Sequence, residues 1–215
     1  MPLIDIANRD REQYIDRSYG LQNVVSFIQS NDTIETVLDL FAGDGSYCSF
    51  ILYNNFNNTL HIEKDPKLFK ELELKFGSDR VLNTDTYKYI KNYKGEKFDF
   101  VFCDNGMWEK EYFNIIPHIK KLLNPGGYFV HNINVKPYGK FSNKSKWGKE
   151  RSKFYNVKDT SDMDYETVMH KTAKRLKEAD AGVKWGVPIE RELYNGHVYL
   201  HFLVWKLDEG NDTPA

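Results

Sequence analysis

Cysteine is scarce in this chain, with Cys48 and Cys103 the only two among 215 residues. Two cysteines are too few for a disulfide scaffold and lack metal-ligand spacing, so we expect both to be small buried hydrophobic residues. No apolar run approaches the roughly 20 residues that a membrane-spanning helix needs. The opening stretch, MPLIDIANRDREQ, lacks the basic region and apolar core of a signal peptide. These absences argue against a disulfide-rich secreted protein and a transmembrane protein, and they predict a cytoplasmic protein with no membrane partner.

An overall excess of charge is also missing, since 30 basic and 31 acidic side chains leave a formal net charge of −1. The charge is nevertheless unevenly distributed along the chain. The segment 136–158 has eight basic residues and one acid, Glu150, so it carries +7 and the remainder carries −8. Its basic residues are interspersed with the aromatic residues Tyr138, Phe141, Trp147, Phe154 and Tyr155. We expect this segment to be a loop or lid.

The spacing of apolar residues predicts alternating helices and strands. Helices are expected over 10–29, 45–55, 66–75, 86–92, 112–123 and 165–176. Parallel strands buried on both faces are expected over 36–41, 59–63, 80–83, 98–103 and 128–135. Two later extended runs, 187–194 and 197–206, are joined by Asn195-Gly196, a dipeptide typical of tight hairpins.

This order of elements is typical of an α/β fold. It predicts a doubly wound, mostly parallel seven-stranded sheet that ends in an antiparallel β-hairpin, with helices on both faces. We expect residues 1–215 to form a single domain. Its last residues, 208–215, are polar and are expected to form a flexible tail.

The first predicted strand runs into a glycine-bearing turn, VLDLFAGDGSY, at 37–47. Gly43 and Gly45 allow a tight turn and a close approach of the backbone to a ligand at the carboxyl edge of the sheet. The helix that follows offers backbone N–H groups to a ligand carboxylate. Asp39, near the end of the strand, can accept a hydrogen bond from an ammonium group, directly or through water.

Acidic residues also follow the next three predicted strands. Glu63 closes the second strand, 18 residues after Gly45, where a carboxylate can accept both hydroxyls of a ribose. Asp85 follows the third strand and also suits the N-cap of the helix that begins near Tyr87. Asp104 closes the fourth strand. Together the four acids predict a line of hydrogen-bond acceptors along one edge of the sheet.

This pattern resembles the first motif and the following strand ends of the class I (Rossmann-like) methyltransferases that use S-adenosyl-L-methionine (SAM). The resemblance covers roughly 30–135 and the final hairpin, and it implies SAM as cofactor and methyl transfer as the reaction. A dinucleotide is the competing ligand, but its G-x-G-x-x-G fingerprint has Cys48 at the third glycine, and Asp44 would repel a pyrophosphate. The residues that the resemblance assigns to the cofactor are Asp39, Phe41, Ala42, Gly43, Gly45, Glu63, Lys64, Asp85, Thr86 and Asp104.

Methyl transfer is an in-line displacement in which the protein aligns the reactants and handles one proton. The groups that do so are expected near the ends of the fourth and fifth strands, where Asp104, His131 and Lys136 are the candidates. His131 can act as general base because the unperturbed pKa of histidine lies near neutrality. The alternative, a strand-end histidine held by backbone hydrogen bonds, fits the sequence slightly better.

A nucleic-acid acceptor is one hypothesis. The basic residues of 136–158 suit phosphates, its aromatic residues suit base stacking, and DLFAG resembles many base-modifying enzymes. Against it, the fourth strand ends in Cys103-Asp104-Asn105-Gly106 and lacks the Asn/Asp-Pro-Pro-aromatic motif of enzymes that methylate exocyclic amines.

A small-molecule acceptor is the second hypothesis. FDFVFCDNGMWEKEYF and NPGGYFVHN resemble catechol-type O-methyltransferases, which hold Mg²⁺ with an acid after the fourth strand and an Asp-Asn pair after the fifth. Here His131-Asn132 replaces that pair, so we expect no metal ion. The sequence thus predicts methyl transfer to an O or N atom, with the basic segment suited to an anionic acceptor. The third hypothesis is an inactive SAM-binding subunit, and the oligomeric state is not predicted.

Overall fold

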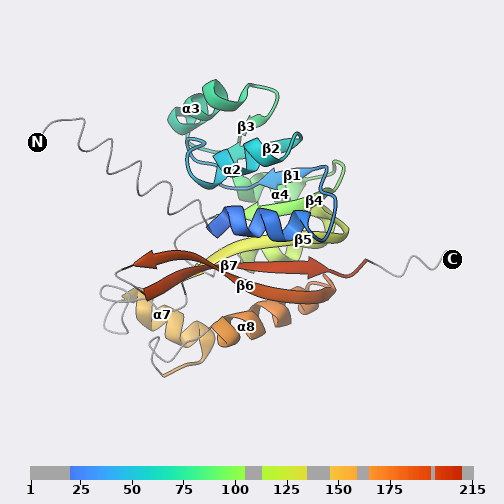
Figure 1. Cartoon of the computed structure of the whole chain (residues 1–215). Coiled ribbons are helices and arrows are strands. Elements are labelled where there is room, and N and C mark those ends of the chain that lie inside the picture. Colours follow the sequence, from blue (N-terminus) through green and yellow to red (C-terminus); the bar gives the residue numbers. More distant parts are fainter. Residues whose placement is uncertain (1–19, 105–112, 135–145, 159–164, 195–196, 210–215) are drawn as a thin grey trace, which may run out of the picture.

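The computed structural model describes residues 20–104, 113–134, 146–158, 165–194 and 197–209. These residues form a seven-stranded sheet with the order β3-β2-β1-β4-β5-β7-β6 (Figure 1). Strands β1 to β5 are parallel, whereas β7 is antiparallel to both β5 and β6. The predicted sheet is therefore confirmed. Its strands are β1 (Val37–Asp39), β2 (Thr59–Glu63), β3 (Val81–Asn83), β4 (Phe98–Cys103), β5 (Leu123–Asn134), β6 (Val183–Tyr194) and β7 (His197–Leu207).

Helices cover both faces of this sheet, as predicted. One face packs against the helix over 20–29, α2 (Cys48–Asn55) and α3 (Pro66–Phe76). The opposite face packs against α4 (Thr86–Asn92), the 3₁₀ helix η1 (Ile116–His118), α6 (Ile119–Leu122), α7 (Lys146–Tyr155) and α8 (Tyr165–Glu178). In Figure 1, α7 and α8 lie beside the antiparallel end of the sheet.

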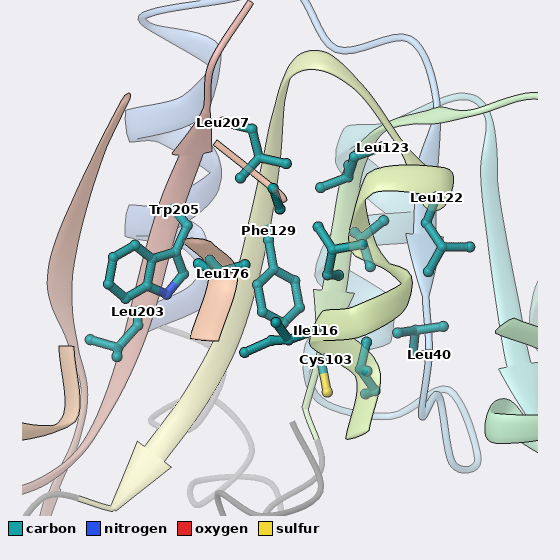
Figure 2. Close-up of a cluster of buried hydrophobic side chains, with 14 of the residues drawn as sticks. Leu40, Cys103, Ile116, Leu122, Leu123, Phe129, Leu176, Leu203, Trp205 and Leu207 are labelled. Atoms are coloured by element: carbon teal, nitrogen blue, oxygen red, sulfur yellow. The ribbon is translucent and has the colours of Figure 1, made fainter. Parts of the chain in front are cut away.

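The central parallel strands are rich in apolar residues because alternate residues enter different cores. In β4, Phe100 and Phe102 join the core under α2, whereas Val101 and Cys103 join the core under α8. Figure 2 shows the second of these cores, in which side chains from β4, β5, β7 and the neighbouring helices meet. Cys48 and Cys103 are both buried and free of disulfides, as expected.

The predicted helix over 112–123 differs from the structure in its second half. Pro117 lies in η1, and β5 already begins at Leu123. A proline has no N–H to donate and its ring crowds the preceding turn, which favours the tighter 3₁₀ turn over a continuous α-helix. The Asn-Pro-Gly-Gly run expected between helix and strand therefore lies within β5. There Gly126 has a φ of +74°, and its N–H donates to the carbonyl oxygen of Asp208 at 2.9 Å.

Ten residues of the segment 136–158, which was expected to be a loop or lid, form the helix α7. Arg151 is fully buried and Tyr155 is nearly so, with the guanidinium carbon 5.6 Å from the centre of the tyrosine ring. This buried side anchors the helix, and the opposite side remains basic and exposed at Lys146, Lys149 and Lys153. The first part of the segment, including Lys136, lies outside the described residues.

The first two residues of the expected flexible tail contact Gly182 and Lys184. Lys184 and Glu209 form an ion pair at 2.5 Å, and the Asp208 N–H donates to the Gly182 carbonyl oxygen at 3.3 Å. Residues 210–215 lie outside the described residues. None of the helices in the described ranges combines the length and the apolar character needed to cross a membrane.

Candidate cofactor site

The carboxyl ends of β3, β2, β1 and β4 are neighbours, in that order, along one edge of the sheet (Figure 1). Each of these ends carries an acid. Asp85 follows β3, Glu63 ends β2, Asp39 ends β1 and Asp104 follows β4. Asp39 is fully buried, and the other three are partly exposed. The strand order thus places all four predicted acids on one edge, which is where ligands bind in open α/β sheets.

The two glycines of the turn after β1 have different roles. Gly43 has a φ of +60°, and a Cβ added there would meet no atom within 4 Å. Gly45 has a φ of +75°, but a Cβ there would lie 2.8 Å from Leu72 Cδ1 and 3.0 Å from Phe76 Cε2. Gly45 therefore lets the turn pack against α3, while Gly43 exposes backbone to open space beside the acids.

Glu63 ties this turn to the end of β2. Its Oε2 accepts a hydrogen bond from the Gly43 N–H at 2.9 Å, and its Oε1 accepts one from the Asp65 N–H at 2.7 Å. Each carboxylate oxygen has two lone pairs, so both can accept a further hydrogen bond. The geometry leaves Glu63 able to receive ligand hydroxyls while it holds the turn.

Asp39 lies beneath the turn and is surrounded by polar groups that the sequence did not reveal. Its Oδ2 accepts a hydrogen bond from Ser49 Oγ at 2.6 Å and lies 2.9 Å from His61 Nδ1. A serine ten residues after the acid and a histidine inside a strand form no recognisable motif. They meet because α2 folds back on the sheet and because Asp39 is opposite His61 in the pairing of β1 with β2.

Asp44 stiffens the turn from its other side. Lys75 Nζ, on α3, donates to the Asp44 carbonyl oxygen at 2.7 Å and to Ser46 Oγ at 2.9 Å. Burial raises the pKa of the Asp44 carboxyl, but hydrogen bonds from Ser46 and the charge of Lys75 outweigh it and lower the pKa below its ordinary value. An ionised carboxylate in this turn disfavours a pyrophosphate, in agreement with the sequence argument.

The remaining predicted cofactor residues lie around the ends of β1, β2 and β3. Asp85 caps α4, with its Oδ1 accepting from the Lys88 N–H at 3.0 Å, and the buried Thr86 hydroxyl donates to the Leu40 carbonyl oxygen. Phe41 contacts Tyr87 edge-on, with 6.1 Å between the ring centres. Ala42 is buried within the turn, and Lys64 is exposed after β2.

The start of α2 is unusual in its backbone. Tyr47, at the N-cap, has a φ of +59° and makes no side-chain capping hydrogen bond. Such a backbone is costly for a residue other than glycine, and it is found most often at functional sites. The N-terminal end of α2, with its positive partial charge, begins directly beside the glycine turn.

Residues 7–190 match the family model described as "Putative S-adenosyl-L-methionine-dependent methyltransferase". The chain belongs to this family. SAM is therefore its cofactor and methyl transfer is its class of reaction, as the resemblance implied. A comparison with curated proteins finds no match.

The fold of this methyltransferase is similar to several solved structures. A SAM-dependent methyltransferase from Clostridium acetobutylicum ATCC 824 is 15% identical, with a TM-score of 0.57 over 94% of this chain and 99% of that chain. NodS, an N-methyltransferase from Bradyrhizobium japonicum WM9 solved with S-adenosyl-L-homocysteine, is 12% identical, with a TM-score of 0.53 over 90% of each chain. At these identities the likeness concerns the fold alone.

The predicted catalytic residues of the methyltransferase differ in their surroundings. Asp104 is partly buried directly after β4, and Lys136 lies outside the described residues. His131 is buried in β5, opposite Cys103, and its Nε2 accepts a hydrogen bond from Trp205 Nε1 at 3.1 Å. Within the described residues, no group of three or more His, Cys, Asp or Glu side chains is arranged to hold a metal ion.

We expect the imidazole of His131 to stay neutral between about pH 5 and pH 8, since burial lowers its pKa to about 3. In an NMR spectrum of the protein labelled with ¹⁵N-histidine, the imidazole nitrogen signals of His131 should keep the same chemical shift over this range. Their absence from the spectrum of His131→Gln assigns them. In the unfolded chain the His131 imidazole binds a proton below its ordinary pKa of 6.5, whereas in the folded protein it stays neutral. His131 should therefore reduce the stability of the fold as the pH falls below 6.5. A His131 resonance that titrates near pH 6.5 would contradict this expectation.

Proposed function

We propose that SAM lies along the edge formed by β3, β2, β1 and β4. Its methionine ammonium bonds to Asp39, directly or through water, and its carboxylate faces the start of α2. Its ribose hydroxyls bond to Glu63, and its adenine lies between Asp85 and Phe41, with Thr86 and Lys64 beside it. The observation that carries this proposal is the line of four acids on adjacent strand ends, next to the open space at Gly43.

The reaction we propose is transfer of the methyl group to an O or N atom of the acceptor. The acceptor lone pair attacks the methyl carbon as the carbon–sulfur bond breaks, which releases S-adenosyl-L-homocysteine. The acceptor proton passes to Asp104, the acid at the end of β4. His131 stays neutral, because its Nε2 accepts a hydrogen bond from Trp205 and burial lowers its pKa. Its role in this region is therefore structural.

The described part of the basic segment favours an anionic acceptor. Exposed lysines recur along one side of α7, at Lys146, Lys149 and Lys153. Two aromatic residues of the segment 136–158 are less available for stacking on bases, because they pack inside the protein. Phe154 packs against Phe113 with 4.9 Å between ring centres, and Tyr155 is buried. We therefore favour a small anionic acceptor, contacted by Lys136 and the lysines of α7, with nucleic acid as the alternative.

Asp104→Asn should reduce kcat by about 100-fold, because removal of a general base costs a factor of about 10² to 10⁴. The SAM dissociation constant should change by a much smaller factor. Release of S-adenosyl-L-homocysteine under saturating SAM and acceptor gives kcat, and calorimetric titration gives the affinity. A kcat that stays within twofold of the original would remove Asp104 from the catalytic step.

The acceptor itself is found by incubating the protein with methyl-labelled SAM and separate pools of RNA, DNA and small metabolites. We expect label in the anionic fraction of the metabolite pool, and its rate of incorporation should fall by about 100-fold with Asp104→Asn. Label in RNA or DNA would establish the nucleic-acid alternative. Binding of SAM without label in any pool would support an inactive binding subunit.

A further inference from the structure

His61 is a polar residue in a place where the fold needs only an apolar one. It occupies the third position of β2 and is completely buried. Its ring packs against Phe76 of α3 and Tyr53 of α2, with 4.7 Å and 6.4 Å between ring centres. Burying an imidazole in such surroundings is costly unless its polar atoms are used.

One ring nitrogen, Nδ1, has a partner at the cofactor edge, whereas Nε2 is buried with no hydrogen-bond partner among the described residues. His61 Nδ1 lies 2.9 Å from Asp39 Oδ2, and because a carboxylate only accepts hydrogen bonds, Nδ1 carries the hydrogen and donates it. Ser49 Oγ donates to the same oxygen at 2.6 Å, and the Ala42 carbonyl oxygen is a second, more distant acceptor at 3.1 Å. Two donors, one from β2 and one from α2, therefore fix a single oxygen of Asp39.

The other oxygen of the Asp39 carboxylate, Oδ1, is not used within the described part of the protein. Among the residues that the structure describes, Asp39 Oδ1 is buried and has no hydrogen-bond partner. A buried carboxylate oxygen without a donor is costly, so its persistence suggests a ligand that supplies one. The chain reverses through the glycine turn three residues after Asp39 and begins α2 beside it.

We infer that His61 is a positioning residue for SAM. Together with Ser49 it holds the Asp39 carboxylate in one orientation, with Oδ2 saturated and Oδ1 presented to the donor that SAM brings, its ammonium group or a water bound to it. His61 does not touch the cofactor and acts through Asp39. The inference rests on the cofactor site proposed above and assigns the orientation of one of its acids to a residue outside the glycine motif.

The test compares SAM affinity in His61→Leu and His61→Asn by calorimetric titration of the full chain. Leucine keeps the apolar packing but removes the donor, and we expect the SAM dissociation constant to rise about tenfold, the value of one charge-assisted hydrogen bond. Asparagine can donate from Nδ2 in place of Nδ1, so it should restore affinity to within about threefold of the original. Ser49→Ala removes the other donor and should weaken binding by about tenfold as well.

A matched control separates positioning from stability. Thr59 lies in the same strand, is 2% exposed, and its hydroxyl donates to the Phe56 carbonyl oxygen at 3.3 Å. Thr59→Val removes a buried hydrogen bond away from Asp39, so it should lower Tm without raising the SAM dissociation constant. An increase in His61→Leu no larger than in Thr59→Val would overturn the inference.

A double-mutant cycle with Asp39→Asn shows whether His61 acts through Asp39. Asp39→Asn alone should weaken SAM binding by about tenfold or more, and adding His61→Leu should weaken it little further. Full additivity of the two effects would overturn the positioning role. If Asp39→Asn itself leaves SAM affinity unchanged, the proposed place of Asp39 in the cofactor site fails instead. Should His61→Leu not fold, Ser49→Ala decides, and unchanged affinity there overturns the inference.

Discussion

Glu63→Gln should raise the SAM dissociation constant by about 100-fold, the effect of losing two hydrogen bonds to a charged group. Glutamine keeps the size of the side chain but has one acceptor oxygen in place of two. Its amide nitrogen must face either the Gly43 N–H or the Asp65 N–H, which Glu63 now accepts at 2.9 Å and 2.7 Å. The substitution therefore weakens both the ribose contact and the tether of the glycine turn.

Calorimetric titration with SAM and with S-adenosyl-L-homocysteine measures this effect, and both ligands should lose affinity because they share the ribose. Glu71→Gln is the matched control, since Glu71 is exposed on α3 and belongs to no predicted contact of the site. Its affinity for SAM should equal that of the unaltered protein. An unchanged SAM affinity in folded Glu63→Gln would remove Glu63 from the cofactor site.

Gly45→Ala should reduce the free energy of unfolding by about 2–4 kcal/mol, the sum of left-handed backbone strain and overpacking. The new Cβ would lie 2.8 Å from Leu72 Cδ1 and 3.0 Å from Phe76 Cε2, so α3 must shift or the turn must open. Gly43→Ala should cost about 1 kcal/mol, because its φ of +60° is the only obstacle there. Denaturation in urea measures both.

For SAM binding the order of the two glycine variants should be reversed, with the larger loss of affinity in Gly43→Ala. A Cβ at Gly43 would project into the space that we propose for the cofactor, so Gly43→Ala should weaken SAM binding more than it destabilises the fold. Gly45→Ala should mainly affect stability. Equal losses of stability in the two variants would show that packing against α3 does not constrain the turn.

Much of the fold could be predicted from the sequence because its signals are local. The limits predicted for β2, β4 and α4 agree with the structure to the residue. In each, a short apolar run or a capping acid is followed by a clear break. The helix over 112–123 was harder to predict, because its apolar spacing continues through Pro117 while its backbone changes to a 3₁₀ turn. Spacing records which residues are buried and does not show where hydrogen bonding changes.

The segment 136–158 shows a related limit. Its composition is basic, which favours a solvated loop, yet Arg151 is buried with its guanidinium beside the ring of Tyr155. Whether a charged residue is covered depends on what packs above it. Here that is decided by the contacts of α7 with α8 and by the place of Tyr155 in the core under α8, which composition does not encode.

The sequence by itself determined the acids at the ends of four strands, because periodicity and a glycine-bearing motif are properties of neighbouring residues. The resemblance of that motif to the class I methyltransferases implied the family and the cofactor, and the family model confirms both. The tertiary structure decided how these residues are held. It placed His61 and Ser49 on Asp39, Glu63 on the Gly43 N–H, and Trp205 on His131. Each of these partners lies in a different strand, helix or loop from the residue that it contacts. Strand register and helix packing bring them together, and both depend on the whole core.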